Sequence, residues 1–406
     1  MTSRWGPRSI LQGWKPATGP AAFDHVVVGA GVSGVLLARE ILDGADRGGL
    51  SKDLRVLLAD PDPGRGRPET LAYWAAGPTS VDRWALGGWD ELTVIGHDQR
   101  AQRIHLGAWR YTAIDWRQAR ADLLAGLTAD PRVTLLAQAV DEVRDGDHSA
   151  AVLVDGRWID GSWVYDSRPP DSSPSPDPRR GRSAQLLQSF SGVWVQTDEP
   201  VVDCSAATLL DFASDDGPEL GFAYVLPVTP LSAMVMAVRM GATADVPDPI
   251  PAVHRELGEH GWQIVGEEGG VTPLVSAPRR SAGRRILDIG VRGGRVRPST
   301  GYALARILAD SRAIAGSLHR HGHPFAIRGD PYRDQILDSI WLQALAQQRA
   351  DLEPAFLALF AHAPITSVLR FLDGRASPLD TARVVAALPR KPFLKSAGQL
   401  AVGHRP

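Results

Sequence analysis

A glycine-rich turn near the start of the chain constrains the fold more than any other feature of the sequence. Residues 24–29 read Asp-His-Val-Val-Val-Gly, which is typical of a buried parallel strand, and residues 32–42 have the apolar spacing of a helix. A second short strand is predicted over 54–60. A strand, a tight turn, a helix and a strand form a βαβ unit. The chain is therefore predicted to open with a doubly wound α/β domain of Rossmann type.

The turn itself, Gly29-Ala30-Gly31-Val32-Ser33-Gly34, matches the dinucleotide fingerprint G-x-G-x-x-G. Gly29 permits the turn, Gly31 lets the backbone approach a pyrophosphate, and Gly34 allows the helix to pack closely on the strand. The N–H groups at the helix start would bind the phosphates. Asp60, at the end of the second predicted strand, is the candidate acceptor for a ribose hydroxyl, and Asp62 is the competing choice.

A second glycine-rich stretch late in the chain favours FAD over NAD as the nucleotide. Residues 288–302 read Asp-Ile-Gly-Val-Arg-Gly-Gly-Arg-Val-Arg-Pro-Ser-Thr-Gly-Tyr and lead into a helix predicted from about Ala303. A helix start at this place could face the flavin or a phosphate; the alternative is a basic surface loop. The predicted cofactor contacts in this stretch are Gly293, Gly294, Arg295, Pro298, Thr300, Gly301 and Tyr302.

Composition and charge limit the remaining classes of function. The formal charge of −2 gives no electrostatic reason to expect a nucleic-acid partner, and the single cysteine, Cys204, excludes an intrachain disulfide. No metal is expected, because the histidines in 319–323 have no carboxylate partner at metal-ligand spacing. No run of 18 apolar residues is present, so we expect a cytoplasmic protein whose membrane contact is at most peripheral.

The chain divides at changes of composition. Residues 169–182 are rich in Pro, Ser, Asp and Arg, which is typical of a loop between domains. A helix is predicted over 116–127 with Asp115 as its cap, and strands are predicted over 133–136 and 151–154. The expected parts are a flexible leader (1–22), a discontinuous FAD-binding domain (23–168 and 276–330), a β-rich substrate-binding domain (183–275) and a C-terminal helical region (331–406).

Several separated segments resemble the lycopene cyclase family, flavoproteins that close a ring on a linear polyene. The resemblance extends from Phe23 to about Leu394, and its clearest pieces are residues 23–31, 57–60, 164–168, 224–230, 293–302 and 335–345. It implies a FAD-binding Rossmann domain joined to a substrate domain, and a FAD that acts in its reduced form without net redox change in the product. Asp166, in one of these pieces, is a further candidate cofactor contact.

The sequence departs from the family where its catalytic acids should lie. Family members have acidic residues shortly after the Leu-Pro-x-Ser/Thr-Pro segment, whereas this chain has Met236 and Ala237, with Arg239 close behind. A cation in a dry pocket needs a proton donor and then a negative or electron-rich partner. Arg239 would repel a cation, although it could bind an anion. The primary hypothesis is therefore a redox-neutral cyclase of a linear, polyene-like isoprenoid or polyketide, with ring closure by cycloaddition in a shaped apolar pocket.

The sequence also fits other functions. The candidate catalytic residues are Met236, Arg239, Asp211 and Glu268, because Asp211, Glu267 or Glu268 could replace the missing acid of an ordinary lycopene beta-cyclase. The Asp166-Ser-Arg168 segment loosely resembles a hydroxylase motif, so a flavin oxidoreductase or monooxygenase that is reduced by NADPH is the runner-up. A non-catalytic flavoprotein that binds a polyene or lipid is the third possibility.

Overall fold

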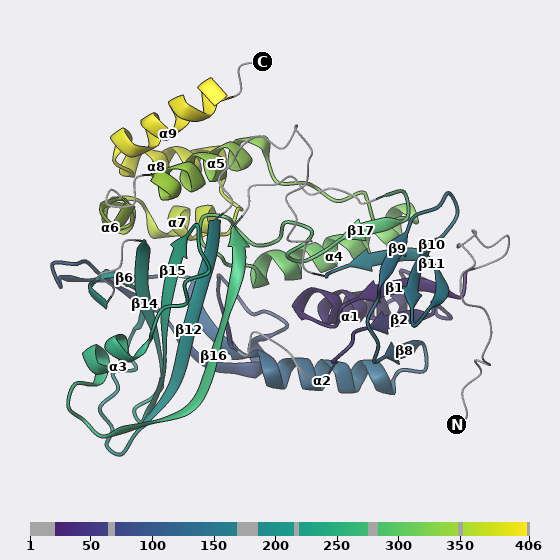
Figure 1. Cartoon of the computed structure of the whole chain (residues 1–406), viewed down its shortest axis with the longest axis horizontal. Coiled ribbons are helices and arrows are strands. Elements are labelled where there is room, and N and C mark those ends of the chain that lie inside the picture. The colour runs from purple at the N-terminus through teal and green to yellow at the C-terminus, as the bar shows by residue number, and fades with distance from the viewer. Residues whose placement is uncertain are drawn as a thin grey trace.

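The computed structural model describes residues 21–63, 70–168, 186–214, 219–274, 283–347 and 352–403. The expected leader falls outside these ranges except for its last two residues, and the expected boundary loop 169–182 also lies outside them. In Figure 1 the nucleotide-binding half lies on the right, the long strands of a second sheet stand on the left, and the C-terminal helices lie at one end of those strands.

The first sheet has the mostly parallel, Rossmann-type arrangement that the sequence predicts. Its strand order is β8-β2-β1-β11-β10-β9, with β17 pairing parallel to β11, and the strands from β8 to β11 are also parallel. The bounds are β1 Phe23–Val28, β2 Val56–Ala59, β8 Val133–Leu136, β9 Glu142–Arg144, β10 Ala150–Val154, β11 Arg157–Asp166 and β17 Ile286–Asp288. The predicted Rossmann-type fold is confirmed.

Three helices cover one face of this sheet. Helix α1 (Val32–Asp46) follows the first strand and packs beside α4 (Leu304–His321), although their sequences are far apart. Val35, Ala38 and Ile41 of α1 are fully buried because they recur every third position on its inner face. Helix α2 (Trp116–Ala129) starts at the predicted cap, where the Asp115 carboxylate accepts a hydrogen bond from the Gln118 N–H at 2.8 Å.

The second sheet has the order β16-β12-β15-β14-β13-β5-β6. Its bounds are β5 Glu91–Ile95, β6 Ala101–His105, β12 Leu186–Thr197, β13 Ala207–Asp211, β14 Leu220–Thr229, β15 Ser232–Gly241 and β16 Trp262–Leu274. Strands β5 and β6 lie in the segment that we assigned to the cofactor domain, yet they extend this sheet because β5 pairs parallel to β13. A further sheet, β3-β7-β4, connects the halves (β3 Thr70–Ala75, β4 Ala85–Trp89, β7 Arg110–Asp115).

The register of the second sheet decides which side chains face the interior. Glu268, Gly192, Met236 and Tyr224 are direct partners across β16, β12, β15 and β14, so they form one row on one face. The even-numbered side chains of β15 join the core shared with the C-terminal helices. The odd-numbered residue Val235 joins the core beneath α3 (Ile250–Leu257) on the other face.

The C-terminal region is helical, and its helices pack against the end of the second sheet (Figure 1). They are α5 Tyr332–Gln347, α6 Leu352–His362, α7 Ile365–Leu372, α8 Pro378–Ala387 and α9 Arg390–Gly403. Ser377 and Asp380 form a capping box that fixes the start of α8.

Two kinds of feature are missing from the part of the chain that the structure describes. None of its helices combines the length and the apolar character needed to cross a bilayer. Within the same residues, no group of three or more His, Cys, Asp or Glu side chains is placed to hold a metal ion.

Candidate active site

The fingerprint turn forms an open cradle at the start of α1. Gly29 has a φ of +94°, in the left-handed region that favours glycine. A Cβ on Gly31 would have no heavy atom within 4 Å, whereas a Cβ on Gly34 would collide with the Gly29 carbonyl oxygen. The Asp60 carboxylate accepts a hydrogen bond from the Ala30 N–H at 2.6 Å. The turn thus leaves room for a pyrophosphate on one side and packs tightly against the sheet on the other.

The late glycine-rich stretch meets this cradle directly. Gly290 has a φ of +62°, and a side chain there would collide with the hydroxyl of Ser33. Thr300, Gly301 and Tyr302 line the same cavity as Gly29 and Ser33. The two predicted cofactor segments therefore lie side by side, although more than 250 residues separate them in the sequence.

The other late candidates lie behind the cavity wall. Arg295 is buried and forms ion pairs with Asp310 at 3.9 Å and Asp330 at 3.5 Å, and its Nε donates to the Gly293 carbonyl. Gly293, Gly294 and Pro298 are also absent from the wall. These residues shape the loop and do not face the cavity.

Asp166 has a similar supporting position. It is buried at the end of β11, where its carboxylate pairs with Arg168 at 2.8 Å and with Arg292 at 3.4 Å. Its neighbours Ser167 and Arg168 line the cavity, and Asp166 does not. Asp166 therefore stabilises the strand end beside the cradle.

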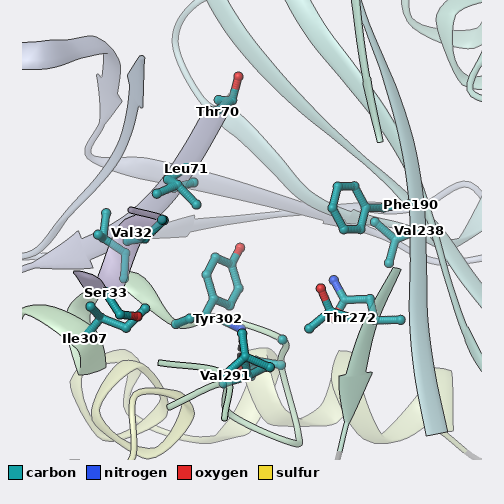
Figure 2. Close-up of a pocket in the computed structure, with 18 of the residues that line it drawn as sticks. Val32, Ser33, Thr70, Leu71, Phe190, Val238, Thr272, Val291, Tyr302 and Ile307 are labelled. Atoms are coloured by element: carbon teal, nitrogen blue, oxygen red, sulfur yellow. Dashed lines mark hydrogen bonds between the residues drawn. The ribbon is translucent and has the colours of Figure 1, made fainter. Parts of the chain in front are cut away.

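One cavity of about 640 Å³ joins the nucleotide cradle to the second sheet. Asp60 and Val32 line it beside the cradle, whereas Phe356 and Leu372 line it from the C-terminal helices. Figure 2 shows Tyr302 in the middle, with Val32 on the cradle side and Phe190 on the sheet side. A cavity of this size and apolar character is typical of a small-molecule site.

Aromatic side chains form much of the wall between these ends. Tyr302 lies 4.8 Å from Trp74, centroid to centroid, and its hydroxyl lies 2.7 Å from that of Tyr111. Burial raises the pKa of Tyr302 to about 12 and also raises the pKa values of Tyr111 and Tyr224. The hydroxyls are therefore neutral at ordinary pH. The aromatic residues that line the cavity are Trp74, Tyr111, Phe190, Phe222, Tyr224, Tyr302, Phe356 and Phe360.

The candidates on β15 separate onto the two faces of the sheet. Met236 is buried and lines the cavity, as do Val238 and Met240. Arg239 has the opposite orientation because side chains alternate along a strand. It forms an ion pair with Asp245 and is not part of the cavity wall.

The three candidate replacement acids have different surroundings. Asp211 is buried outside the cavity wall, where it accepts from the Ala213 N–H at 3.0 Å and pairs with Arg255 at 3.1 Å. Glu267 is exposed on the opposite face of β16. Glu268 lies in the row of Met236 and Tyr224, and its Oε2 accepts a hydrogen bond at 3.0 Å from the N–H of Thr70.

The sequence indicated Tyr302 of the aromatic wall, but it did not indicate Tyr111, Phe190 or Tyr224. Tyr111 comes from β7, and Phe190 and Tyr224 come from neighbouring strands of the second sheet. The period-2 pattern of β12 and β14 could have suggested one inward face. It could not show which strands are neighbours, because strand pairing depends on contacts between distant segments.

A parallel Rossmann-type sheet, a fingerprint turn with room for a pyrophosphate and a second loop against that turn define a FAD-binding flavoprotein. The sequence model of the family described as lycopene cyclase protein matches residues 24–398, so the chain belongs to the lycopene cyclase family. Both the resemblance seen in the sequence and FAD as the expected cofactor are thereby confirmed.

Individual relatives are distant. The chain is 23% identical over 353 residues to neoxanthin synthase of Solanum tuberosum and 22% identical over 355 residues to lycopene beta cyclase of Arabidopsis thaliana. Each alignment covers 80% of this chain and 66% of the relative, so the chain spans just under two thirds of the length of these relatives.

Solved structures show the same fold. A geranylgeranyl bacteriochlorophyll reductase-like protein from Thermoplasma acidophilum superposes with a TM-score of 0.64 at 13% identity, covering 93% of this chain and 99% of that protein. A halogenase solved with phloroglucinol and FAD gives a TM-score of 0.55 at 10% identity, covering 94% and 95%.

Proposed function

We propose that this protein is a FAD-dependent, redox-neutral cyclase of a linear, polyene-like natural product, either an isoprenoid or a polyketide. The observation that carries the proposal is the single cavity that connects the nucleotide cradle to an apolar, aromatic chamber under the second sheet. A long unsaturated chain matches this chamber in polarity, and the cavity would hold the reacting end beside the flavin.

The wall favours ring closure by control of the substrate conformation. Tyr224 and Tyr302 would fix the fold of the polyene by close packing, while Met236 supplies an apolar surface at the place where the family has an acid. Holding reacting atoms in a near-attack geometry lowers a barrier by several kcal/mol without any proton transfer. A cycloaddition would need no acid.

Carboxyl groups contribute little to this chamber. Asp60, the carboxylate among the described wall residues, lies at the cradle end. Glu268 is nearest in register to Met236, but one of its oxygens already accepts the N–H of Thr70. A role for Glu268 as a relocated acid is the alternative within the same family, and we place it second for this reason.

The residues of the cradle fit FAD. Gly31 would lie against the pyrophosphate, Asp60 would accept from a ribose hydroxyl, and Thr300 with Gly301 would face the flavin end. When bound, FAD supplies an electron-rich ring in its reduced state. In a redox-neutral reaction this ring is not consumed, so NADPH would serve at most to reduce the flavin once.

Turnover of an acyclic polyene by the purified holoprotein tests the proposal. We expect a cyclic product with the mass of the substrate, formed without stoichiometric loss of NADPH. Failure to convert any acyclic isoprenoid or polyketide polyene, with the flavin either oxidised or reduced, would contradict it. Retention of the polyene without turnover would instead favour a non-catalytic binding protein.

A flavin oxidoreductase or monooxygenase is the second candidate, because the fold is shared with a reductase-like protein and a halogenase. The two arginines considered as anchors for an anionic substrate do not favour it. Arg168 pairs with Asp166, and Arg239 pairs with Asp245 outside the cavity. Stopped-flow spectra distinguish the classes, since a monooxygenase requires rapid flavin bleaching by NADPH and reoxidation that depends on substrate and oxygen.

A further inference from the structure

A second cavity, of about 220 Å³, lies among the C-terminal helices. Trp341 of α5, Leu359 of α6, Phe371 of α7 and Phe393 of α9 contribute to its wall. The rings of Trp341 and Phe393 are stacked with centroids 5.8 Å apart, so packed aromatic surface forms one side. This cavity is distinct from the main cavity, although the two share part of their walls.

The second cavity adjoins the main one at residues that the two share. Phe356, Leu372 and Ser299 line both cavities. Phe356 and Leu372 belong to the C-terminal helices, which supply most of the wall of the second cavity. These three shared residues form a common wall between the reaction chamber and the helical region.

The wall of the second cavity favours a hydrocarbon. Its buried acid, Asp338, lies 3.2 Å from the buried guanidinium of Arg297, so that charge is already paired. Most of the remaining wall is Leu, Phe, Trp, Ile and Val. A polar or charged ligand would lose its hydration there without finding partners, which is unfavourable by several kcal/mol.

The second cavity also opens at the surface. Leu394 is 68% exposed and Val385 is 45% exposed, and both belong to its wall. Exposed apolar side chains at the mouth of an apolar cavity allow a hydrocarbon to enter without crossing polar surface. Arg390 lies at the same mouth and is exposed.

The main cavity is too small to hold both the flavin and the whole of a long substrate. A site of about 300–1,000 Å³ suits one drug-sized ligand. The main cavity, at about 640 Å³, must admit the flavin end of FAD as well as the substrate. A long polyene therefore needs space beyond it, and the adjoining apolar cavity shares part of its wall with the reaction chamber.

We propose that the second cavity binds the unreacted end of the same linear isoprenoid hydrocarbon whose other end cyclises in the main cavity. The chain would pass between Phe356 and Leu372, and the mouth at Leu394 would be its way in. This proposal rests on the proposed function. It assigns to the C-terminal helices a binding role that selects for long substrates.

A variant that fills the second cavity tests this assignment. Ala397, a half-buried wall residue of α9, is replaced by tryptophan; the matched control is the same change at Ala382, an exposed residue of α8 outside the wall. The probes are lycopene, as a long acyclic polyene, and farnesene, as a short one. Binding to the holoprotein is measured by equilibrium titration, with flavin content and far-UV circular dichroism as checks of the fold.

We expect A397W to weaken lycopene binding about tenfold or more and to change farnesene binding by less than about twofold, because each excluded methylene is worth about 0.8 kcal/mol. A382W should bind both probes like the wild type. Equal binding of lycopene by A397W and wild type would overturn the proposal, as would an equal loss for both probes. If the wild type cyclises polyenes and A397W does so equally well, this inference fails while the proposed function stands.

A second measurement does not depend on the variant. A lycopene derivative with a diazirine at one end is bound to the wild-type holoprotein and illuminated, and the labelled peptides are identified by mass spectrometry. Labels on residues 337–341 or 393–397 support the proposal. Labels confined to strands of the second sheet would overturn it. So would a wild-type dimer that A397W converts to a monomer, since the cavity would then be covered by a second copy of the chain.

Discussion

The hydroxyl oxygens of Tyr111 and Tyr302 lie 2.7 Å apart, and this hydrogen bond joins strand β7 to the late glycine-rich loop. Both side chains line the main cavity, and burial raises both pKa values, so the pair stays neutral. The tyrosines are therefore suited to shape an apolar substrate and, through their ring faces, to stabilise positive charge that develops on it. They are poorly suited to act as acids.

Two substitutions of Tyr302 distinguish the contribution of its ring to turnover from that of its hydroxyl. Y302F removes one hydrogen bond worth about 1 kcal/mol and should lower polyene turnover by less than about tenfold. Y302L removes the ring beside Trp74 and should lower turnover by about tenfold more than Y302F. Steady-state assays of the holoproteins check this order. A loss in Y302F as large as that in Y302L would show that the hydroxyl, rather than the ring, does the chemistry.

The glycines of α1 provide a test of the nucleotide cradle. A Cβ at Gly34 collides with the Gly29 carbonyl oxygen, so G34A should displace the helix from its strand and abolish flavin retention. G31E should fold, because the space around Gly31 is open, but its charged side chain would occupy and repel the pyrophosphate. Absorbance in the flavin region after gel filtration measures both effects.

Gly44, on the same helix, is the matched control. A Cβ there makes ordinary contact at 3.4 Å with Leu50, and alanine improves helix propensity by about 1 kcal/mol. G44A should therefore keep its flavin. Full flavin retention by G34A and G31E would mean that the nucleotide binds elsewhere.

Much of the first domain could be predicted from the sequence, because its signals are local. The apolar strand, the glycine turn and the helix of residues 23–46 follow one another directly, and each has a recognisable pattern. The sequence also indicated the glycine-rich stretch 288–302 as a cofactor contact, but only the structure shows that Gly290 lies against Ser33. A contact between distant segments has no signature in either segment alone.

The second sheet was harder to predict for the same reason. Alternation along β15 means that Met236 and Arg239 cannot both face the cavity, and the sequence pattern alone could have shown this. It could not show that Glu268 lies in the row of Met236, because that depends on the register of three strands. The pairing of β5 with β13 is another contact between distant segments, so neither segment alone predicts it.

Substitutions of Met236 and Glu268 test whether cyclisation depends on the shape of the chamber or on a proton donor. M236W fills the chamber and should lower turnover roughly 100-fold with flavin binding intact, because a small misplacement of the reacting atoms has effects of that size. M236L, which nearly conserves volume, should stay within about tenfold. Product formation by liquid chromatography is the measurement.

Substitutions of the three candidate acids test the requirement for a proton donor. E268Q should keep activity within about tenfold, and E267Q and D211N should do the same because their side chains lie outside the cavity wall. A loss of several orders of magnitude in E268Q alone, with fold and flavin intact, would restore acid-initiated chemistry with Glu268 as the donor.

Stability should depend on pH through His25. This residue is buried in β1 with its Nδ1 3.1 Å from the Tyr165 hydroxyl, and burial lowers its pKa from 6.5 to about 4. The unfolded chain therefore binds a proton between these values that the folded chain does not. The stabilisation is complete above pH 6.5 and is lost as the pH falls toward 4, so about 2–3 kcal/mol should be lost by pH 4.5.

Urea unfolding of wild type and H25Q at pH 7 and pH 4.5 measures this effect. The variant has no titrating group at this position, so its free energy of unfolding should fall by about 2–3 kcal/mol less than that of the wild type over the same pH change. Parallel losses in the two proteins would assign the acid sensitivity to other groups.

Turnover of an acyclic polyene in deuterium oxide, followed by exact mass analysis of the product, tests the central claim most directly. A redox-neutral, shape-directed cyclase should release a cyclic isomer with the mass of its substrate and no deuterium from the solvent, since no proton is added to the polyene. A product that carries solvent deuterium would indicate acid-initiated cyclisation, and one that has gained oxygen or lost hydrogen would indicate an oxidoreductase. Either result would contradict the claim.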